Sequence, residues 1–276
     1  YCAFCIIPKL RGRYRSRTLD AIVQEARELA DLGVKELIVI AQDITRWGMD
    51  LYGKPSLALL LRELAKIDGI RWIRLHYLYP EIIDDELIDL IASEDKIVKY
   101  LDIPIQHIDN DILRRMNRRY TAEHYKSLIA DAREKMPDIT LSSDIIVGFP
   151  GETDEDFEQT LRLVQDTRFD LLFTFLYSPR TGTPAASYED NASPQDKQRR
   201  FERLLKTQDD IVAEKQAAYQ GKTLRLLVDG AAKGPDYPYT ARTEGNLLVC
   251  VRGENIQIGE FIQAEIEKTS LRCLFA

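Results

Sequence analysis

Two cysteines, Cys2 and Cys5, stand three positions apart at the start of this 276-residue sequence, in the segment YCAFCIIPKLRGRYRSR. This spacing is compatible with half of a zinc ribbon, a dithiol redox pair or part of an iron–sulfur site. The zinc interpretation lacks a second close pair of Cys or His residues, because Cys250 and Cys273 lie far away and apart from each other. A thioredoxin-like pair normally lies between a strand and a helix, whereas a long basic loop follows here. The chance presence of two cysteines near an irregular chain end is the remaining alternative.

Composition limits the class of protein that could carry this pair. The chain is 45% hydrophobic and 30% charged, which is enough to bury a sizeable core. Its formal net charge of -7 argues against nonspecific affinity for nucleic acid and favours a basic partner. No run of eighteen apolar residues and no secretory signal occurs, so we expect a cytoplasmic protein that does not associate with membranes.

Short apolar strands alternate with amphipathic helices along the first two thirds of the chain. ELIVIA, RWIRLHYL, VKYLDIPIQ, ITLSSDIIVGF and LLFTFLYS have the character of strands buried in a parallel sheet. The helices between them carry recognisable caps, such as Thr18 and the capping box from Thr153 to Asp156. With a first strand around the opening cysteines, the pattern predicts an α/β fold with about six β/α repeats. This is a partial (β/α)6 TIM-like barrel, whose chemistry belongs at the C-terminal ends of its strands.

A long helix connects this region to a second domain. It is predicted to begin at the Ser193 cap, with Pro194 in its first turn, and to end at Gly221. Short alternating segments between turns follow it, which predicts a small all-β, barrel-like domain. We therefore place the core with its connecting helix at residues 1–219 and the β domain at residues 220–276. An alternative is that the β domain binds RNA and the barrel is inactive, which would predict an excess of basic residues in the β domain. Its seven basic residues are balanced by seven acidic ones, so the charge does not support this alternative.

Five segments in the same order resemble the radical S-adenosylmethionine (SAM) methylthiotransferases. They are YCAFCIIPKLRGRYRSR, VIAQDITRWGMDLYG, KYLDIPIQH, DIIVGFPGETDEDFEQT and YSPRTGTPAA, and the tail is similar to a TRAM domain. In that family three cysteines spaced C-x-x-x-C-x-x-C hold a [4Fe-4S] cluster whose fourth iron is left open for SAM. Cys2 and Cys5 match the second and third of these cysteines. The resemblance thus implies a barrel of the radical SAM type and a cofactor pair of cluster and SAM.

The resemblance also implies parts that this sequence does not contain. The first cluster cysteine would be the third residue before Tyr1, and an N-terminal domain with a second [4Fe-4S] cluster would precede it. We therefore expect the chain by itself to be inactive, with a labile or missing cluster. In the complete enzyme the cluster passes an electron into SAM, and the resulting 5′-deoxyadenosyl radical abstracts hydrogen from an unactivated carbon.

Candidate SAM contacts follow the ends of predicted strands. Gln42 and Asp43 come directly after ELIVIA, where an amide or carboxylate can bind the SAM amino group or ribose, although they could equally cap a loop. Ile146 and Gly148 lie in DIIVGFPGET, which resembles the adenine-side segment of radical SAM barrels, although helix packing could also require the glycine. Gln106 ends another strand at the same mouth, and the neighbouring His107 could be structural or contact substrate.

Two branches of the family differ in substrate. AQDITRWGMDLYG and KYLDIPIQHI resemble the RimO branch, which modifies an aspartate of a small-subunit ribosomal protein. NRRYT, SSDIIVGFPGETDEDFEQT, YSPRTGTPAA and, in the tail, ARTEGNLLVCVRG resemble the MiaB branch, which modifies a tRNA adenosine. The strand-end segments and the acidic balance favour the ribosomal protein. The family also implies an electron donor such as flavodoxin or ferredoxin. An inactive core fragment and another type of radical SAM enzyme remain alternatives.

Overall fold

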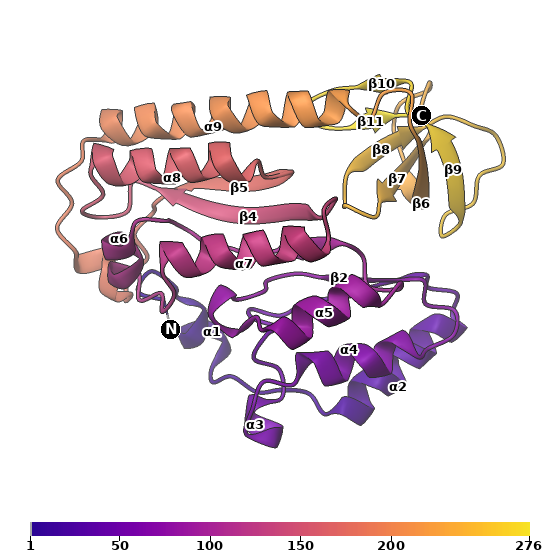
Figure 1. Ribbon diagram of the computed structural model, residues 1–276, viewed down its shortest axis with the longest axis horizontal. Helices are drawn as coiled ribbons and strands as arrows, with labels where there is room; N and C mark the ends of the chain where they lie inside the picture. The colour runs from indigo at the N-terminus through magenta and orange to yellow at the C-terminus, as the bar shows by residue number, and fades with distance from the viewer. Residues whose placement is uncertain (1) are drawn as a thin grey trace.

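Five parallel strands form the centre of the first domain in this computed structural model, which describes residues 2–276 (Figure 1). They form two parallel sheets, one of β1 and β2 and one of β3, β4 and β5, which an isolated bridge between Ile73 and Ile97 connects. The result is an open half-barrel, as expected from the β/α alternation. The strands are β1 (Glu36–Val39), β2 (Trp72–Leu75), β3 (Tyr100–Asp102), β4 (Thr140–Val147) and β5 (Leu171–Leu176).

Helices cover the outer face of these strands. Alternate strand residues such as Leu37, Leu75 and Ile145 point outward into one large apolar core that the helices complete. No helix among residues 2–276 has both the length and the apolar character needed to cross a membrane. The helices and 3-10 turns are α1 (Ile7–Arg11), α2 (Leu19–Asp31), α3 (Met49–Tyr52), α4 (Leu57–Ala65), η1 (Pro80–Ile82), α5 (Asp85–Ser93), α6 (Asn110–Arg115), α7 (Ala122–Lys135), α8 (Asp154–Thr167), η2 (Pro184–Ser187) and α9 (Pro194–Ala217).

The predicted helix starts are confirmed. The Thr18 side chain accepts a hydrogen bond from the Ala21 amide at the start of α2, and Thr153 and Asp156 form the complete capping box of α8. Ser193 caps α9, with Pro194 in the first turn. Each capping side chain accepts a hydrogen bond from a backbone amide that has no partner within the helix. The capping residues alone were therefore sufficient to predict where these helices begin.

Two predicted elements were wrong in detail. No strand forms around Cys2 and Cys5, because the chain makes a turn there and then enters α1, whose first turn contains Pro8. Proline has no amide hydrogen for a sheet and suits the first helical turn. The described chain therefore has five core strands instead of six. The connecting helix ends at Ala217, before Gly221, because the Gly221 amide hydrogen-bonds to the Ile266 carbonyl of the β domain.

The C-terminal β domain is a single six-stranded sheet. Its strands follow the order β10-β11-β8-β7-β6-β9, and their inner side chains form a separate apolar core that includes Leu226, Val249 and Leu274. This confirms the predicted all-β tail. The strands are β6 (Thr223–Ala231), β7 (Tyr239–Thr243), β8 (Leu248–Val251), β9 (Phe261–Glu265), β10 (Lys268–Thr269) and β11 (Leu274–Phe275).

The β domain closes the N-terminal end of the half-barrel. Trp72, Tyr100, Leu227 and Phe261 share an apolar cluster at this junction. Arg74 is almost fully buried there, pairs with Glu36 at 2.6 Å and donates to the carbonyls of residues 243 and 244 in the β domain. Figure 1 shows α9 running beside α8 toward the β domain, while the N-terminus and α1 lie at the opposite end. The C-terminal ends of the strands are thus left open.

Candidate active site

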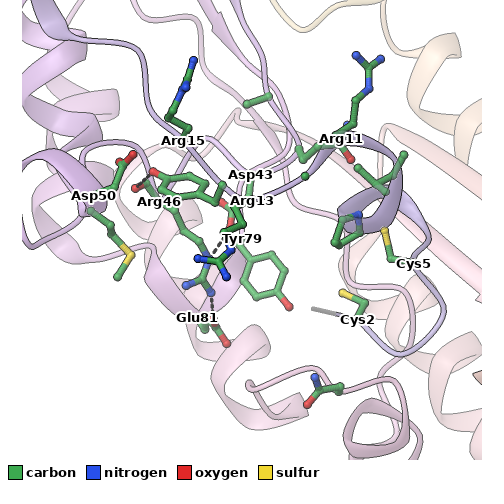
Figure 2. A pocket seen from close by; sticks show the side chains of 18 of the residues that line it. Cys2, Cys5, Arg11, Arg13, Arg15, Asp43, Arg46, Asp50, Tyr79 and Glu81 are labelled. Atoms are coloured by element: carbon green, nitrogen blue, oxygen red, sulfur yellow. Dashed lines mark hydrogen bonds and ion pairs between the residues drawn. The ribbon is translucent and has the colours of Figure 1, made fainter. Parts of the chain in front are cut away.

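The two N-terminal cysteines lie on a loop that is fixed to the rest of the core. The Ala3 amide donates to the Met116 carbonyl at the end of α6 at 2.8 Å, and the Ala185 amide donates to the Ala3 carbonyl at 3.0 Å. Ala3 and Phe4 also pack into a small apolar cluster with Phe149. Cys2 and Cys5 are free, half-buried thiols, and their sulfur atoms face the same cavity in Figure 2. The loop therefore holds both thiols in place independently of any disulfide.

This cavity is a cleft of about 780 Å³ at the mouth of the half-barrel. It collects residues from the cysteine loop, from α1 and the basic segment behind it, and from the chain that follows β1, β2 and α6. Its polar and thiol lining comprises Cys2, Cys5, Arg11, Arg13, Tyr14, Arg15, Gln42, Asp43, Arg46, Asp50, Tyr79, Glu81, Asn117 and Arg119. Four of the residues predicted from the sequence, Cys2, Cys5, Gln42 and Asp43, are thus brought to one cleft.

Asp43 is held in one orientation by its neighbours. Its carboxylate accepts hydrogen bonds from the Thr45 amide at 3.0 Å and from Arg46 Nε at 2.8 Å. Arg46 also pairs with Glu81 and lies over the Tyr79 ring, 5.5 Å from its centre. Gln42 beside it is exposed to the cleft. The loop after β1 therefore presents a fixed carboxylate and a freer amide, and Asp43 serves both as a lining residue and as a loop cap.

Gln106, Ile146 and Gly148 are not among the residues that line the cleft. Gln106 is buried and has a positive φ of 67°, and it exchanges backbone hydrogen bonds with β4 at Asp144 and Ile146. A left-handed non-glycine residue at a strand end stores strain of the kind that clusters at functional sites. Ile146 packs against the cluster that contains Ala3. Through Ile146, the end of β4 thus packs against the loop that carries the cysteines.

Gly148 has a structural reason to be glycine. Its φ is +75°, and a Cβ added there would approach Lys197 side-chain carbons to 2.8 Å. Its amide donates to the buried Glu152 carboxylate at 2.8 Å. His107 belongs to the same buried group, because its Nε2 lies 3.5 Å from Glu152 and its Nδ1 accepts from the Asp109 amide. These contacts support a structural role for His107. They also show that packing favours glycine at position 148, beside its proposed role near the adenine of SAM.

Polar residues line the interior of the half-barrel between its two ends. His76 Nδ1 lies 2.9 Å from the Asp102 carboxylate. Asp102 pairs with Ser142 of β4, and Asp144, two positions further along β4, points to the same inner face. Burial, together with the nearby charge of Asp102, raises the pKa of Asp144 to about 6. The sequence analysis gave His76 no function, and only the spatial proximity of β2, β3 and β4 reveals this group.

Three further residues were missed, namely Tyr79, Arg118 and Tyr120. Tyr79 separates the cleft from Arg118, which lies 4.6 Å from the centre of the Tyr79 ring and 5.9 Å from that of Tyr120. Burial raises the pKa of Tyr79, and Arg118 opposes this shift. Figure 2 shows the Tyr79 hydroxyl end directed toward Cys2. The only sequence signal was the position of Tyr79 shortly after a predicted strand, since Arg118 lies in an ordinary polar turn.

The residue types at the mouth fit an iron–sulfur site better than a zinc site. Among residues 2–276, no group of three or more His, Cys, Asp or Glu side chains is arranged to hold a metal ion by itself. Cys250 on β8 and Cys273 next to β11 lie in the β domain, so they do not complete a site with Cys2 and Cys5. Two free thiols on a shared cleft supply two of the three thiolates that an open [4Fe-4S] site requires.

Comparison with known proteins agrees with this arrangement. The family described as "Radical SAM superfamily" matches residues 1–164, and the TRAM domain family matches residues 217–276. A methyltransferase of Kitasatospora setae, TsrM, whose structure contains cobalamin and a [4Fe-4S] cluster, superposes with a TM-score of 0.55 at 22% identity and covers 67% of this chain and 36% of that one. Methylornithine synthase, PylB, gives 0.52 at 16% identity over 75% of this chain and 58% of that one. These structural likenesses support the fold.

Curated relatives match nearly the whole chain. "Ribosomal protein uS12 methylthiotransferase RimO" of Geotalea uraniireducens is 44% identical over 98% of this chain and 61% of its own length. The protein of the same name from Clostridioides difficile is 45% identical over 96% and 61%. A "tRNA-2-methylthio-N(6)-dimethylallyladenosine synthase" of Acetivibrio thermocellus is 43% identical over 96% and 55%. The chain thus spans about three fifths of the length of the first of these relatives. It belongs to the radical SAM superfamily and is similar to the methylthiotransferases within it.

Proposed function

We propose that this chain is the catalytic core and TRAM domain of a radical SAM methylthiotransferase. The carrying observation is that the free thiols of Cys2 and Cys5 share one cleft with Gln42 and Asp43 at the open ends of the strands. Chemistry at the C-terminal ends of parallel strands is the rule for such barrels. The relatives that match almost the full chain are methylthiotransferases, which supports this reaction class.

Cys2 and Cys5 would hold two irons of a [4Fe-4S] cluster in this proposal. When bound, the cluster and SAM supply one-electron chemistry that activates a C–H bond, fed by a donor such as flavodoxin or ferredoxin. Asp43, fixed by Thr45 and Arg46, would accept hydrogen bonds from SAM, and Gln42 would contribute an adaptable amide. Gln106, Ile146 and Gly148 would support the cysteine loop and the adenine side of SAM.

The preferred substrate is an aspartate of a small-subunit ribosomal protein. Several relatives with 42–45% identity carry the RimO name, and the acidic balance of the chain suits a basic protein partner. The alternative substrate is a tRNA adenosine, which the relative of Acetivibrio thermocellus supports by its name and its 43% identity. A protein with only another radical SAM activity is the third possibility.

The test begins with the cofactor. Full-length protein, loaded anaerobically with iron and sulfide, should bind iron and cleave SAM, and Cys2→Ala and Cys5→Ala should each lose both properties. Cys250→Ala is the matched control, because this thiol is also half-buried but lies in the β domain. Retention of full iron and SAM cleavage in both N-terminal variants would refute the proposed site.

The substrate is then decided by competition. Ribosomal protein S12 and tRNA are offered together, and mass spectrometry locates the added methylthio group. We expect the group on the aspartate of the ribosomal protein. Modification of tRNA alone would replace the preferred substrate by the alternative. SAM cleavage without modification of either would indicate a different radical SAM reaction.

A further inference from the structure

Arg118 is a buried cation without a carboxylate partner. It is 8% exposed and lies just beneath the cleft, and no ion pair joins it to an acidic side chain anywhere in residues 2–276. One terminal nitrogen donates to the Pro104 carbonyl at 3.0 Å, while Nε is buried without a hydrogen-bond partner. The other well-buried arginines differ in this respect. Arg74 pairs with Glu36, and Arg200 pairs with Glu152 at 3.1 Å.

An isolated buried charge is unfavourable, so a counter-charge is expected close to Arg118. The two tyrosines that stack on the guanidinium offer only ring faces and phenols, which attract the cation without neutralising it. Asp144 lies within electrostatic reach of Arg118, which partly opposes the rise in the pKa of this carboxyl, but no hydrogen bond or ion pair among the described residues joins the two side chains. No carboxylate of the described chain therefore pairs directly with Arg118, and its Nε is left without a hydrogen-bond partner.

The cysteine loop is the neighbour that can supply the missing negative charge. A negative charge on Cys2 would raise the pKa of Arg118, and it would also raise the pKa of Tyr79. The backbone explains this proximity, because the Ala3 amide is hydrogen-bonded to Met116, two residues before Arg118. The fold of the chain itself thus holds the guanidinium within electrostatic reach of Cys2.

We propose that Arg118 is the fixed counter-charge of the iron–sulfur centre that Cys2 and Cys5 hold. The inference rests on the proposed function. A [4Fe-4S] centre with thiolate ligands is anionic, and it gains one further negative charge when it accepts one electron from the donor protein. A permanent cation buried nearby stabilises this reduced form more than the oxidised form, because the low dielectric of the interior strengthens the attraction. Arg118 therefore acts as a positioning residue that sets the reduction potential and does not touch substrate.

The experiment is a redox titration of the cluster in the full-length, cofactor-loaded protein, followed by electron paramagnetic resonance. Arg118→Gln keeps similar size and polarity but removes the charge, and at a fixed potential the ratio of reduced to oxidised cluster should fall about tenfold or more. For a one-electron couple this is a midpoint about 59 mV more negative. Arg118→Lys keeps the charge and should stay within about threefold of the parent.

Arg74→Gln is the matched control. Arg74 is also buried and also lies over two aromatic rings, but it has a carboxylate partner and lies at the opposite end of the half-barrel. Its loss should reduce stability and leave the midpoint unchanged. A change in Arg74→Gln equal to that in Arg118→Gln would show a general effect of lost packing and would overturn the inference.

The remaining outcomes also decide the question. An unchanged midpoint in Arg118→Gln with full iron content refutes the role of Arg118 but leaves the proposed function intact. Equal iron loss in Arg118→Gln and Arg118→Lys shows a steric role and also refutes it, whereas iron loss in the Gln variant alone supports it. If the parent protein binds no cluster, both the function and the inference fail.

Discussion

Asp144 shows how the half-barrel interior changes the chemistry of a single carboxyl group. Its pKa is raised to about 6 by burial and by the charge of Asp102. A carboxyl whose pKa is higher in the folded than in the unfolded state contributes stability below pH 4, and this contribution is lost as the pH rises through 6. At neutral pH the ionised group therefore destabilises the fold.

We predict that Asp144→Asn stabilises the protein at pH 7 by up to about 3 kcal/mol, the equivalent of a shift of about two pKa units. Because the asparagine does not ionise, the gain should shrink toward pH 4. Thermal unfolding at several pH values measures it, with the exposed Asp131→Asn as a control that should show no such trend. A gain that is independent of pH would contradict the assigned cause.

Cys250 should be the least reactive of the four thiols. Burial and a hydrogen bond with Cys273 raise its pKa to about 11, so only about one thiol in a thousand is ionised at pH 8. Iodoacetamide labelling followed by mass spectrometry should find Cys250 unmodified when Cys2 and Cys5 have reacted. Cys273→Ala removes one cause of the shift and should accelerate the reaction. Fast labelling of Cys250 in the parent protein would disprove this prediction.

Residues next to predicted strands could be located from the sequence, but their partners could not. Gln42 and Asp43 were placed at the mouth because strand ends in a parallel fold share one edge. Arg118 escaped notice because its importance depends on contacts with Tyr79 and with the cysteine loop, which are 39 and more than 110 positions away. No local pattern encodes such a contact.

At the scale of elements, Glu152 links three segments through one buried carboxylate. It accepts from the Gly148 amide after β4 and from Arg200 on α9, and it lies beside His107. Its side chain is fully buried, so this group fixes α8 and α9 against the end of β4. Helix boundaries were predictable from caps, but this buried connection was not, since its members lie on separate elements.

We expect Glu152→Ala to destabilise the fold by about 2–3 kcal/mol, because it removes the buried carboxylate that accepts from the Gly148 amide and leaves Arg200 only its more exposed partner, Asp154. Glu152→Gln should cost less, since the amide oxygen can still accept from Gly148. Denaturant unfolding measures both variants. Glu158→Ala, which breaks the more exposed pair with Arg203, is the control and should cost at most about 1 kcal/mol. Equal losses in the two alanine variants would argue against the buried connection.

At the scale of the whole molecule, Arg74 couples the two domains. It joins Glu36 of β1 to backbone carbonyls of the β domain, within an apolar contact that contains Trp72 and Phe261. The proposed division at residues 219/220 lies between the end of α9 and the start of β6. The class of both domains followed from sequence periodicity, whereas their packing depended on side chains that no single segment identifies.

Replacement of Arg74 by Met should therefore separate the unfolding of the two domains. The largely buried Glu36, whose side chain is 13% exposed, would lose its partner, at a cost of about 3 kcal/mol. Calorimetry should show one transition in the parent and two in the variant, and limited proteolysis should cut between residues 217 and 223. Arg242→Ala removes a partly exposed pair inside the β domain and should keep the parent profile. A single transition in Arg74→Met would show that the apolar contact alone couples the domains.

The placement of the β domain limits how a macromolecule can meet this protein. The β domain packs against one end of the strands, whereas α1 lies at the opposite end (Figure 1). The cleft lined by Cys2 and Cys5 lies at that opposite end. A short peptide or a lone nucleotide could occupy the cleft but could not reach the tail at the same time. A partner that contacts both must be large enough to extend along the side of the core. It could then bind the β domain while its target atom lies in the cleft.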